Sequence, residues 1–380
     1  MGAGRISKIA LIYRICSYTS KFFPCPKYPT GTIHGMALAD IRTACDSIAE
    51  SLEKSLSGDG MHHLGLAMLR ARDEGNPDIF RQKLSDAIRR TQEIGKDKYV
   101  PADNEDKEIR NVRQYMPFCN LYIWDSQTDS IPISGALKDD QVPDTRLNPP
   151  VELTERIFQI RLINFWRNNS PKVDSEYDIV LAEKRYEALC NEFLPTLPRA
   201  FVLEPNKQWD KDFPWLPYQR EFLHISIFSS ICYNYRPVLQ LEPQKIQSLP
   251  ANDRALLGPQ RKALAVAAFN VLTRYLNLHT LESGISTRLP DIIMPTFDAA
   301  VLLAALYANR GMEWECKNYR HCMLRVNPFE THMESLKPEL CMETLRSTLD
   351  HLQKCAETSV LAKTAAETLD RVLKRVNDGH

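Results

Sequence analysis

The sequence predicts an all-α protein, a large irregular domain of roughly 12–15 helices without internal repeats. Apolar residues recur every three to four positions through most of the chain, which is the spacing of one helix face. Alternating strand patterns and Asn-Gly turns are nearly absent. Several helix-length stretches also lack charged residues, and such stretches are typical of helices buried on all sides.

Apolar stripes identify the helices of the first half of the chain. They predict helices over 41–56, 80–91 and 109–123. Asp78 precedes the second stripe and is its candidate N-terminal cap. Pro117 lies inside the third stripe, so this helix is either kinked or begins later than its stripe.

The second half contains the most apolar helices. Residues 222–235 carry no formal charge with His224 neutral, which predicts a central helix with Phe228 and Ile231 in the main core. Five prolines between 195 and 217 predict a long irregular loop. The other predicted helices of this half span 153–167, 264–279, 296–309, 345–356 and 361–376.

Charge and cysteine content exclude several classes of protein. Lys plus Arg and Asp plus Glu are both 48, and no basic run is present, so neither a nucleic-acid patch nor a nuclear-import signal is visible. The ten cysteines form no C-x-x-C pair, as expected of reduced thiols. Arg14 interrupts the apolar N-terminal stretch, and the longest apolar block, 299–308, is too short to span a bilayer. These features predict a soluble, intracellular protein.

The strongest catalytic candidate is an aspartate cluster, Asp139, Asp140 and Asp144. All-helical terpenoid cyclases hold magnesium on a diphosphate with such carboxylates, because hard oxygen ligands suit a hard cation. The second acidic motif that this chemistry requires is absent from the sequence. We therefore interpret the cluster as a solvated acidic loop and retain a terpenoid cyclase using Asp139 and Asp140 as the alternative function.

Other side chains with chemical potential lack the partners that catalysis or metal binding needs. A structural zinc site takes four ligands in paired short spacings, whereas the candidate group offers Cys316, His321 and Cys322, with His332 as a distant fourth. His224 lies among apolar residues, and a histidine base needs an orienting acid and a reacting group beside it. Asp125 follows two aromatic residues and resembles a helix-terminal carboxylate. We predict no enzymatic activity, no metal and no cofactor.

Two stretches carry a resemblance to a known family. The first includes Ala87, Ile94 and Gly95, and closes on Asn120, Tyr122, Ile123, Trp124 and Asp125. The second lies in 216–239 and includes Arg220, Leu223, His224, Arg236 and Pro237. Over roughly 40–312, the chain resembles the regulatory (middle homology) domain of fungal-specific transcription factors of the zinc binuclear-cluster family. The resemblance implies a large helical domain in which these signature residues are structural.

The chain departs from the family pattern in three places. Tyr115, Met116 and Pro117 replace an Arg-rich run, and Ser130, Ile131 and Pro132 replace a Gly-Arg-Pro or Arg-Ile-Pro element. The spacing of Cys16, Cys25 and Cys45 does not match the six-cysteine zinc cluster that reads DNA in the family. We therefore expect a regulatory domain without its DNA reader, with no zinc and no direct DNA binding.

The resemblance implies a nuclear regulator of transcription by RNA polymerase II that acts through partner or small-ligand binding. The expected partners are the transcription machinery or a regulatory protein, together with a small-molecule effector, and no membrane. We predict an N-terminal segment over 1–35, the regulatory domain over 36–312 and a helical extension over 313–380 packed on it. A helical adaptor that binds protein through its C-terminal helices is the remaining alternative.

Overall fold

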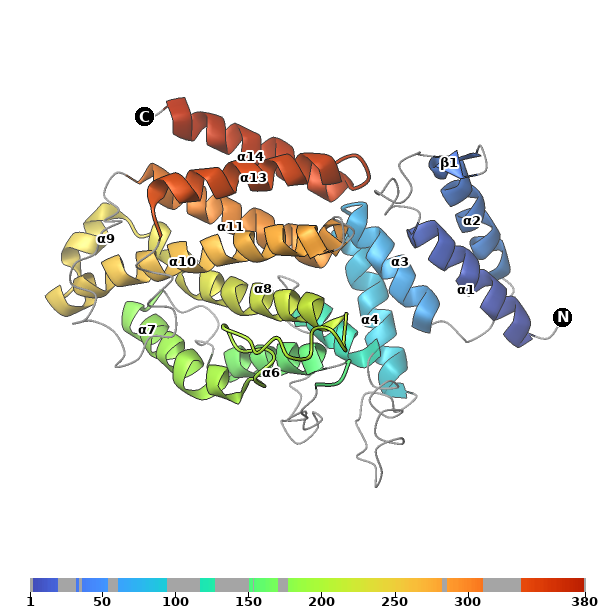
Figure 1. Ribbon diagram of the computed structural model, residues 1–380, viewed down its shortest axis with the longest axis horizontal. Helices are drawn as coiled ribbons and strands as arrows, with labels where there is room; N and C mark the ends of the chain where they lie inside the picture. Colours follow the sequence, from blue (N-terminus) through green and yellow to red (C-terminus); the bar gives the residue numbers. More distant parts are fainter. Residues whose placement is uncertain are drawn as a thin grey trace, which may run out of the picture. The chain divides into compact units, whose positions relative to one another are not determined.

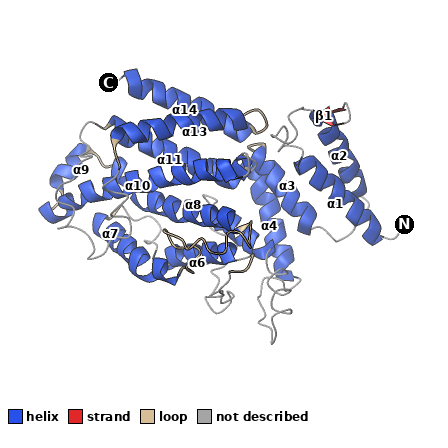
Figure 2. Cartoon of the chain, viewed as in Figure 1, coloured by secondary structure: helices blue, strands red, loops and turns tan. Residues whose placement is uncertain are grey.

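Helices dominate the computed structural model, which confirms the predicted all-α fold class (Figure 2). Among the described residues, the only β-structure is a pair of strands of two residues each. The structure describes residues 3–19, 32–33, 36–53, 61–93, 117–126, 150–152, 154–169, 177–281, 286–309 and 336–378.

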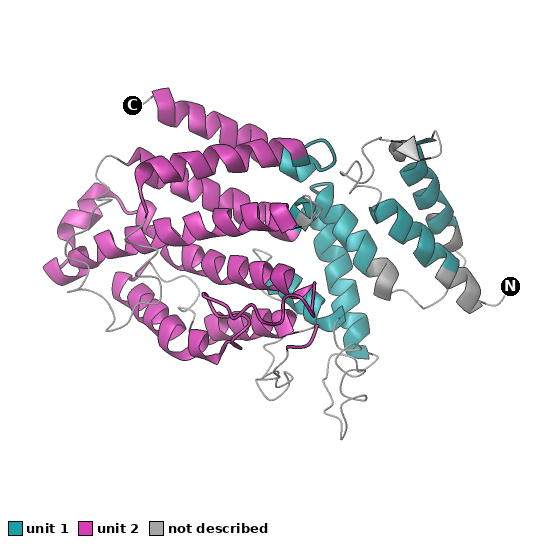
Figure 3. Ribbon diagram, in the orientation of Figure 1, with its two compact units in different colours: residues 1–143, 282–290, 355–364 teal, residues 144–281, 291–354, 365–380 magenta. Residues whose placement is uncertain are grey.

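The chain divides into two compact units, which Figure 3 colours separately. Unit 1 contains residues 1–143, 282–290 and 355–364. Unit 2 contains residues 144–281, 291–354 and 365–380. The domain boundaries at residues 35 and 312 remain predictions.

Unit 1 begins with a long helix and a small hairpin, followed by a series of amphipathic helices (Figure 1). The hairpin pairs Thr32 with Ala37 and Ile33 with Met36 in antiparallel register. Its elements are α1 (Ala3–Thr19), β1 (Thr32–Ile33), β2 (Met36–Ala37), α2 (Leu38–Glu53), α3 (Met61–Asp73), α4 (Pro77–Glu93) and a helix over 117–126.

The stripe predicted in 80–91 forms the buried face of α4. Its buried residues are Phe80, Leu84, Ala87, Ile88 and Thr91. The four apolar side chains among them share a core cluster with Met68 and Ala71 of α3 and with Leu121 and Trp124 of the helix 117–126. Burial of one apolar face stabilises helices that would be marginal in isolation.

The α3–α4 corner corrects one predicted cap. Gly75 adopts a φ of +71°, a left-handed conformation that glycine accepts without a steric penalty. The Asn76 N–H donates to the Ala71 carbonyl at 2.9 Å and closes the end of α3. Because α4 begins at Pro77, Asp78 lies in its first turn and is not the residue preceding the helix.

Pro117 is the first described residue of the helix over 117–126. The structure therefore does not test whether the stripe predicted in 109–123 is kinked at this proline or begins later, and both alternatives stay predictions. Residues 109–116 of that stripe lie outside the described residues.

The remaining elements follow residue 150, and most of them belong to unit 2 (Figure 1). They are α6 (Thr154–Asn168), α7 (Ile179–Ala188), the π turn η3 (Leu189–Phe193), the 3-10 turn η4 (Leu194–Thr196), α8 (Leu216–Tyr235), the 3-10 turn η5 (Arg236–Leu239), α9 (Pro243–Ser248), α10 (Ala251–Leu281), the 3-10 turn η6 (Ser286–Arg288), α11 (Pro290–Ala308), α13 (Pro338–Cys355) and α14 (Val360–Asp378).

Helix α8 is the central helix of unit 2. It packs extensively along α10 and also contacts α6 and α7. Phe228 is fully buried and Ile231 is 2% exposed, which confirms their predicted place in the core. Proline-rich residues 197–215 form the predicted irregular loop that leads into α8. The loop directly precedes α8 in the sequence, and side-chain hydrogen bonds from α8 hold it in place.

Helices α11, α13 and α14 complete the described chain. Leu345 and Leu352 of α13 and Leu369 and Val376 of α14 are buried, so the predicted stripes face the protein interior. On the exposed face of α14, Lys374 binds Asp370 at 2.7 Å, and Arg371 donates to the Glu367 carbonyl at 3.3 Å. Helix α11 is apolar and long enough to cross a membrane by length and composition, a property shared with core helices of soluble proteins.

We expect Phe228→Ala to lower the free energy of unfolding by about 3–5 kcal/mol, because it removes a buried ring and leaves a cavity. The matched control is Tyr233→Ala on the same helix. Its side chain is 68% exposed and contacts the Arg236 guanidinium, so a loss of at most about 1 kcal/mol is expected. Urea denaturation of both variants provides the comparison, and equal losses would contradict the placement of Phe228.

Candidate functional site

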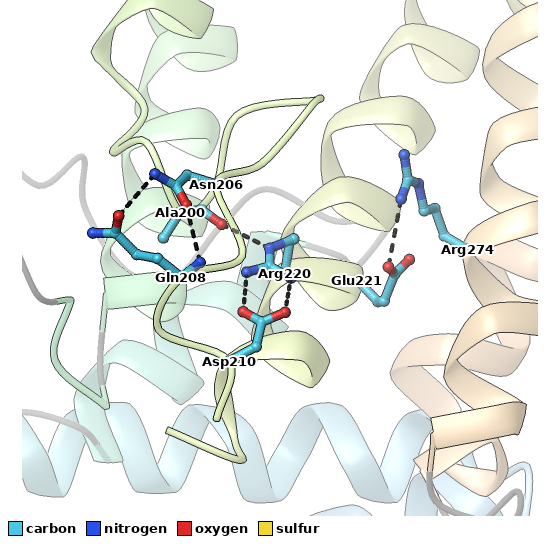
Figure 4. Close-up of polar contacts among 7 residues, drawn as sticks. All are labelled: Ala200, Asn206, Gln208, Asp210, Arg220, Glu221 and Arg274. Atoms are coloured by element: carbon cyan, nitrogen blue, oxygen red, sulfur yellow. Dashed lines mark hydrogen bonds and ion pairs between the residues drawn. The ribbon is translucent and has the colours of Figure 1, made fainter. Parts of the chain in front are cut away.

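Arg220 connects helix α8 to the loop that precedes it (Figure 4). The guanidinium donates two hydrogen bonds to the Asp210 carboxylate, from Nη2 at 2.7 Å and from Nη1 at 3.2 Å. Its Nε donates to the Ala200 carbonyl at 2.7 Å. The planar fork of arginine suits this bidentate geometry, and lysine cannot reproduce it. Arg220 thus holds two points of the loop while being only 3% exposed.

His224 lies one helical turn after Arg220 and contacts the same loop. Its Nε2 is 2.9 Å from the Phe201 carbonyl, which only accepts hydrogen bonds, so Nε2 carries the proton. Burial, followed by the positive charge of Arg274, lowers the pKa of His224 to about 3. The imidazole is therefore neutral at physiological pH and serves as a hydrogen-bond donor to the backbone.

Together, the two signature residues of α8 anchor the loop 197–215. We call Arg220, His224, Asp210 and the carbonyls of Ala200 and Phe201 the loop anchor. Asn206 stabilises the loop locally, because its Oδ1 accepts from the Gln208 N–H at 2.9 Å. In the loop anchor, the hydrogen bonds of Arg220 and His224 fix the position of the loop against α8. No reacting group is needed to explain their presence.

Arg236 and Pro237 end helix α8. Arg236 occupies its C-cap position, and Pro237 follows inside the 3-10 turn η5. The Arg236 guanidinium lies 4.6 Å from the centroid of the Tyr233 ring, a cation–π contact on an exposed surface. Arg236 and Pro237 therefore lie where the central helix ends and the chain turns toward α9.

The other signature residues lie in unit 1, on the helix 117–126. Tyr122 is fully buried beside Phe118, with ring centroids 6.4 Å apart, and Trp124 packs in the α3–α4 core cluster. Asp125 is 1% exposed and lies near the end of the described part of the helix. Asn120, by contrast, is partly buried. Tyr122, Trp124 and Asp125 are therefore buried in unit 1, and the structural role that the resemblance implied stays a prediction.

The candidate catalytic and metal-binding clusters cannot be placed. Asp139, Asp140 and Asp144 lie outside the described residues, as do all four candidate zinc ligands, Cys316, His321, Cys322 and His332. Within the part of the chain that the structure describes, no three His, Cys, Asp or Glu side chains are grouped so that they could hold a metal ion.

A buried polar network joins α7, α8 and α10, and the sequence analysis did not identify it. The Tyr235 hydroxyl donates to Glu183 Oε2 at 3.1 Å, and Gln260 Nε2 donates to the same oxygen at 3.2 Å. Gln260 in turn accepts from the Tyr177 hydroxyl at 3.0 Å. Burial raises the pKa of the Glu183 carboxyl above its ordinary value. The network ties three helices through residues that are as much as 83 positions apart.

A second unpredicted cluster joins the first three helices of unit 1. Asp46 of α2 accepts from Arg14 of α1 at 3.3 Å and from Arg70 of α3 at 2.5 Å. Arg70 also binds Glu74 at 2.7 Å. Two guanidinium groups therefore share one buried carboxylate. The signal in the sequence is weak, because each residue taken alone resembles an ordinary surface charge.

We expect Arg220→Lys to destabilise the protein by about 1–3 kcal/mol, because lysine cannot donate to Asp210 and Ala200 together. A double-mutant cycle with Asp210→Asn isolates the contribution of the ion pair, with an expected coupling of about 0.5–3 kcal/mol. Arg236→Lys is the control, since its side chain is exposed. Urea unfolding that gives additive losses for Arg220 and Asp210 would contradict the anchor.

His224 makes stability depend on pH. Its pKa is about 3 in the folded protein and about 6.5 when unfolded, so acid protonates the unfolded chain first and favours unfolding. Stability is therefore lost as pH falls from about 6.5 toward 3. Between pH 7.5 and pH 5, we expect His224 to account for about 2 kcal/mol of this loss.

The control for this pH dependence is His224→Gln, which keeps a donor for the Phe201 carbonyl but does not titrate. Denaturation midpoints of both proteins, measured at pH 7.5 and pH 5, provide the comparison. A variant that loses as much stability as the natural protein would show that another group causes the acid sensitivity.

Comparisons with known proteins identify relatives of the whole chain. It is 32% identical over 393 aligned residues to the probable transcription factor sol4 of Alternaria solani, covering 96% of this chain and 70% of sol4. It is also 32% identical over 399 residues to transcription factor xilB of Penicillium rubens, covering 96% of this chain and 58% of xilB. No family model and no solved structure matches the chain. On the strength of these two relatives, the chain belongs to the family of fungal transcription factors that includes sol4 and xilB.

Proposed function

We propose that this chain is the regulatory part of a fungal transcription factor and controls transcription by RNA polymerase II through a protein partner or a small effector. The main support for this proposal is the sequence similarity to sol4 and xilB, which covers 96% of the chain. The chain spans 70% of the length of sol4 and 58% of xilB. Its role accordingly corresponds to part of those longer proteins.

The use of the signature side chains supports a regulatory function without catalysis. Arg220 and His224 hold a loop through hydrogen bonds to its backbone, and Tyr122 and Trp124 fill a core. A catalytic histidine works best with a pKa near the operating pH, whereas burial lowers the pKa of His224 to about 3. These residues build a scaffold on which binding surfaces can be placed.

The proposal includes the finer features that the family resemblance implied. Residues 36–312 would form the fungal-specific regulatory domain of a zinc binuclear-cluster factor that acts in the nucleus. The chain 1–380 would not read DNA directly, since its net charge is zero and specific readers need several cations held on one surface. The expected partners are the transcription machinery or a regulatory protein.

A tethering experiment tests the regulatory function. Residues 1–380 are fused to an unrelated DNA-binding domain and expressed in a fungal host with a reporter that carries its operator. We expect reporter transcription to change several-fold relative to the DNA-binding domain alone. Chromatin immunoprecipitation at the operator establishes that the fusion is nuclear and bound.

Two variants control for folding in this experiment. Phe228→Ala should lose the effect, because it destabilises the core, whereas Tyr233→Ala should retain it. A fusion that occupies the operator, is present at normal abundance and leaves transcription unchanged in either direction would refute the proposal.

A further inference from the structure

Unit 1 contains a cavity of about 130 Å³ beside the Asp46 cluster. Its wall comes from α1, α2 and α3 and from the turn that leads into α14, all within unit 1. Arg14 and Ser17 are buried at 9% and 4% exposure, whereas Val360 is 59% exposed and lies at the rim. The cavity therefore reaches from a buried polar wall to the surface.

The charges around the cavity balance. Three arginines (Arg14, Arg42 and Arg70) and three acidic residues (Asp46, Asp73 and Glu74) line it. A ligand with a single charge would upset this balance in a partly buried site, where an uncompensated charge is costly. A zwitterion adds no net charge and offers a carboxylate to guanidinium groups and an ammonium to carboxylates.

The guanidinium groups favour a planar carboxylate as the anionic end. Arg14 and Arg70 bind the carboxylate of Asp46 through one guanidinium nitrogen each, and a ligand carboxylate would bind to the remaining N–H groups and to Arg42. Arginine binds carboxylates with parallel hydrogen bonds, and this geometry is lost with a spherical anion. The ammonium end would then face the acidic side chains of Asp73 and Glu74.

Size and apolar lining define the rest of the ligand. An engineered cavity of about 150 Å³ holds a benzene molecule, so the present cavity suits a molecule of about six to eight non-hydrogen atoms. Leu66, Ala67 and Val360 provide an apolar portion of the wall. A short aliphatic side chain fits these contacts.

We propose that this cavity binds a free α-amino acid with a small aliphatic side chain. The inference rests on the proposed regulatory function and names the class of effector for it. Such binding would join α1, α2 and α3 to the turn before α14 and would stabilise unit 1 in proportion to ligand concentration. Ligand binding is measured on the purified protein and not through transcription. A negative binding result would therefore refute this inference without refuting the regulatory function that the tethering experiment tests.

The first test compares three matched probes on purified 1–380 by isothermal calorimetry and thermal unfolding. L-valine carries both charges, 3-methylbutanoate keeps the side chain and carboxylate, and 2-methylpropan-1-amine keeps the side chain and ammonium. We expect valine to bind with a dissociation constant of about 1 mM or tighter and to raise the melting temperature. Each singly charged probe should bind at least tenfold more weakly.

The second test places the binding in the cavity. Arg42→Gln and Asp73→Asn each remove one charge from the lining, and both should weaken valine binding at least tenfold. The matched control is Arg81→Gln on α4, an exposed arginine that does not line the cavity, and it should bind valine normally. Circular dichroism and the melting temperature without ligand establish that the variants are folded.

Three results would overturn the proposal. The first is no valine binding at 20-fold the expected dissociation constant. The second is equal binding of 3-methylbutanoate or 2-methylpropan-1-amine, which would make the site one for simple anions or cations. The third is valine binding that both cavity variants leave unchanged. The comparison of the three probes uses only the natural protein, so it tests the proposed amino-acid binding even if a variant fails to fold.

Discussion

The burial of helix α8 constrains the rest of unit 2. A helix that is covered on nearly all sides keeps its buried polar side chains from water, so these side chains need partners inside the protein. Arg220 and His224 find theirs in the preceding loop. Glu221 reaches Arg274 of α10 at 3.4 Å, and Asn234 donates to the Ala182 carbonyl of α7 at 2.9 Å.

These partners determine where the neighbouring elements lie. The irregular loop 197–215 has few backbone hydrogen bonds of its own, and the loop anchor gives it fixed contacts on α8. At the other end of the helix, Tyr235 joins Glu183 and Gln260 in the network that spans α7 and α10. Apolar packing alone tolerates small shifts between helices, whereas such directional contacts specify one arrangement. Specificity in unit 2 thus comes from its few buried polar groups.

Periodicity in the sequence identified most of the long helices, though not α1, α3 or α7, and it identified none of these contacts. The stripe of 80–91 coincides with the buried face of α4, and the uncharged stretch 222–235 lies within the central helix. Both signals are local, because a helix face repeats within a few residues. The partners of Glu183 lie 52 and 77 residues away, and a single sequence carries no record of such pairings. Family resemblance singled out Arg220 and His224 but not Asp210, the loop partner of Arg220, or Asp46 in unit 1.

The π turn η3 accommodates one extra residue before the loop. In η3, the Leu194 N–H reaches back five residues to the Leu189 carbonyl, so this turn contains one residue more than an α-helical turn. Because the extra residue is taken up within a single turn, deleting one residue there would restore an ordinary helical turn and leave the following chain in nearly the same orientation. Deleting one residue from the regular helix α7 would instead rotate the loop by about 100° relative to the start of that helix and carry Ala200 and Phe201 away from α8. The loop anchor therefore tolerates a change of chain length in η3 better than the same change in α7.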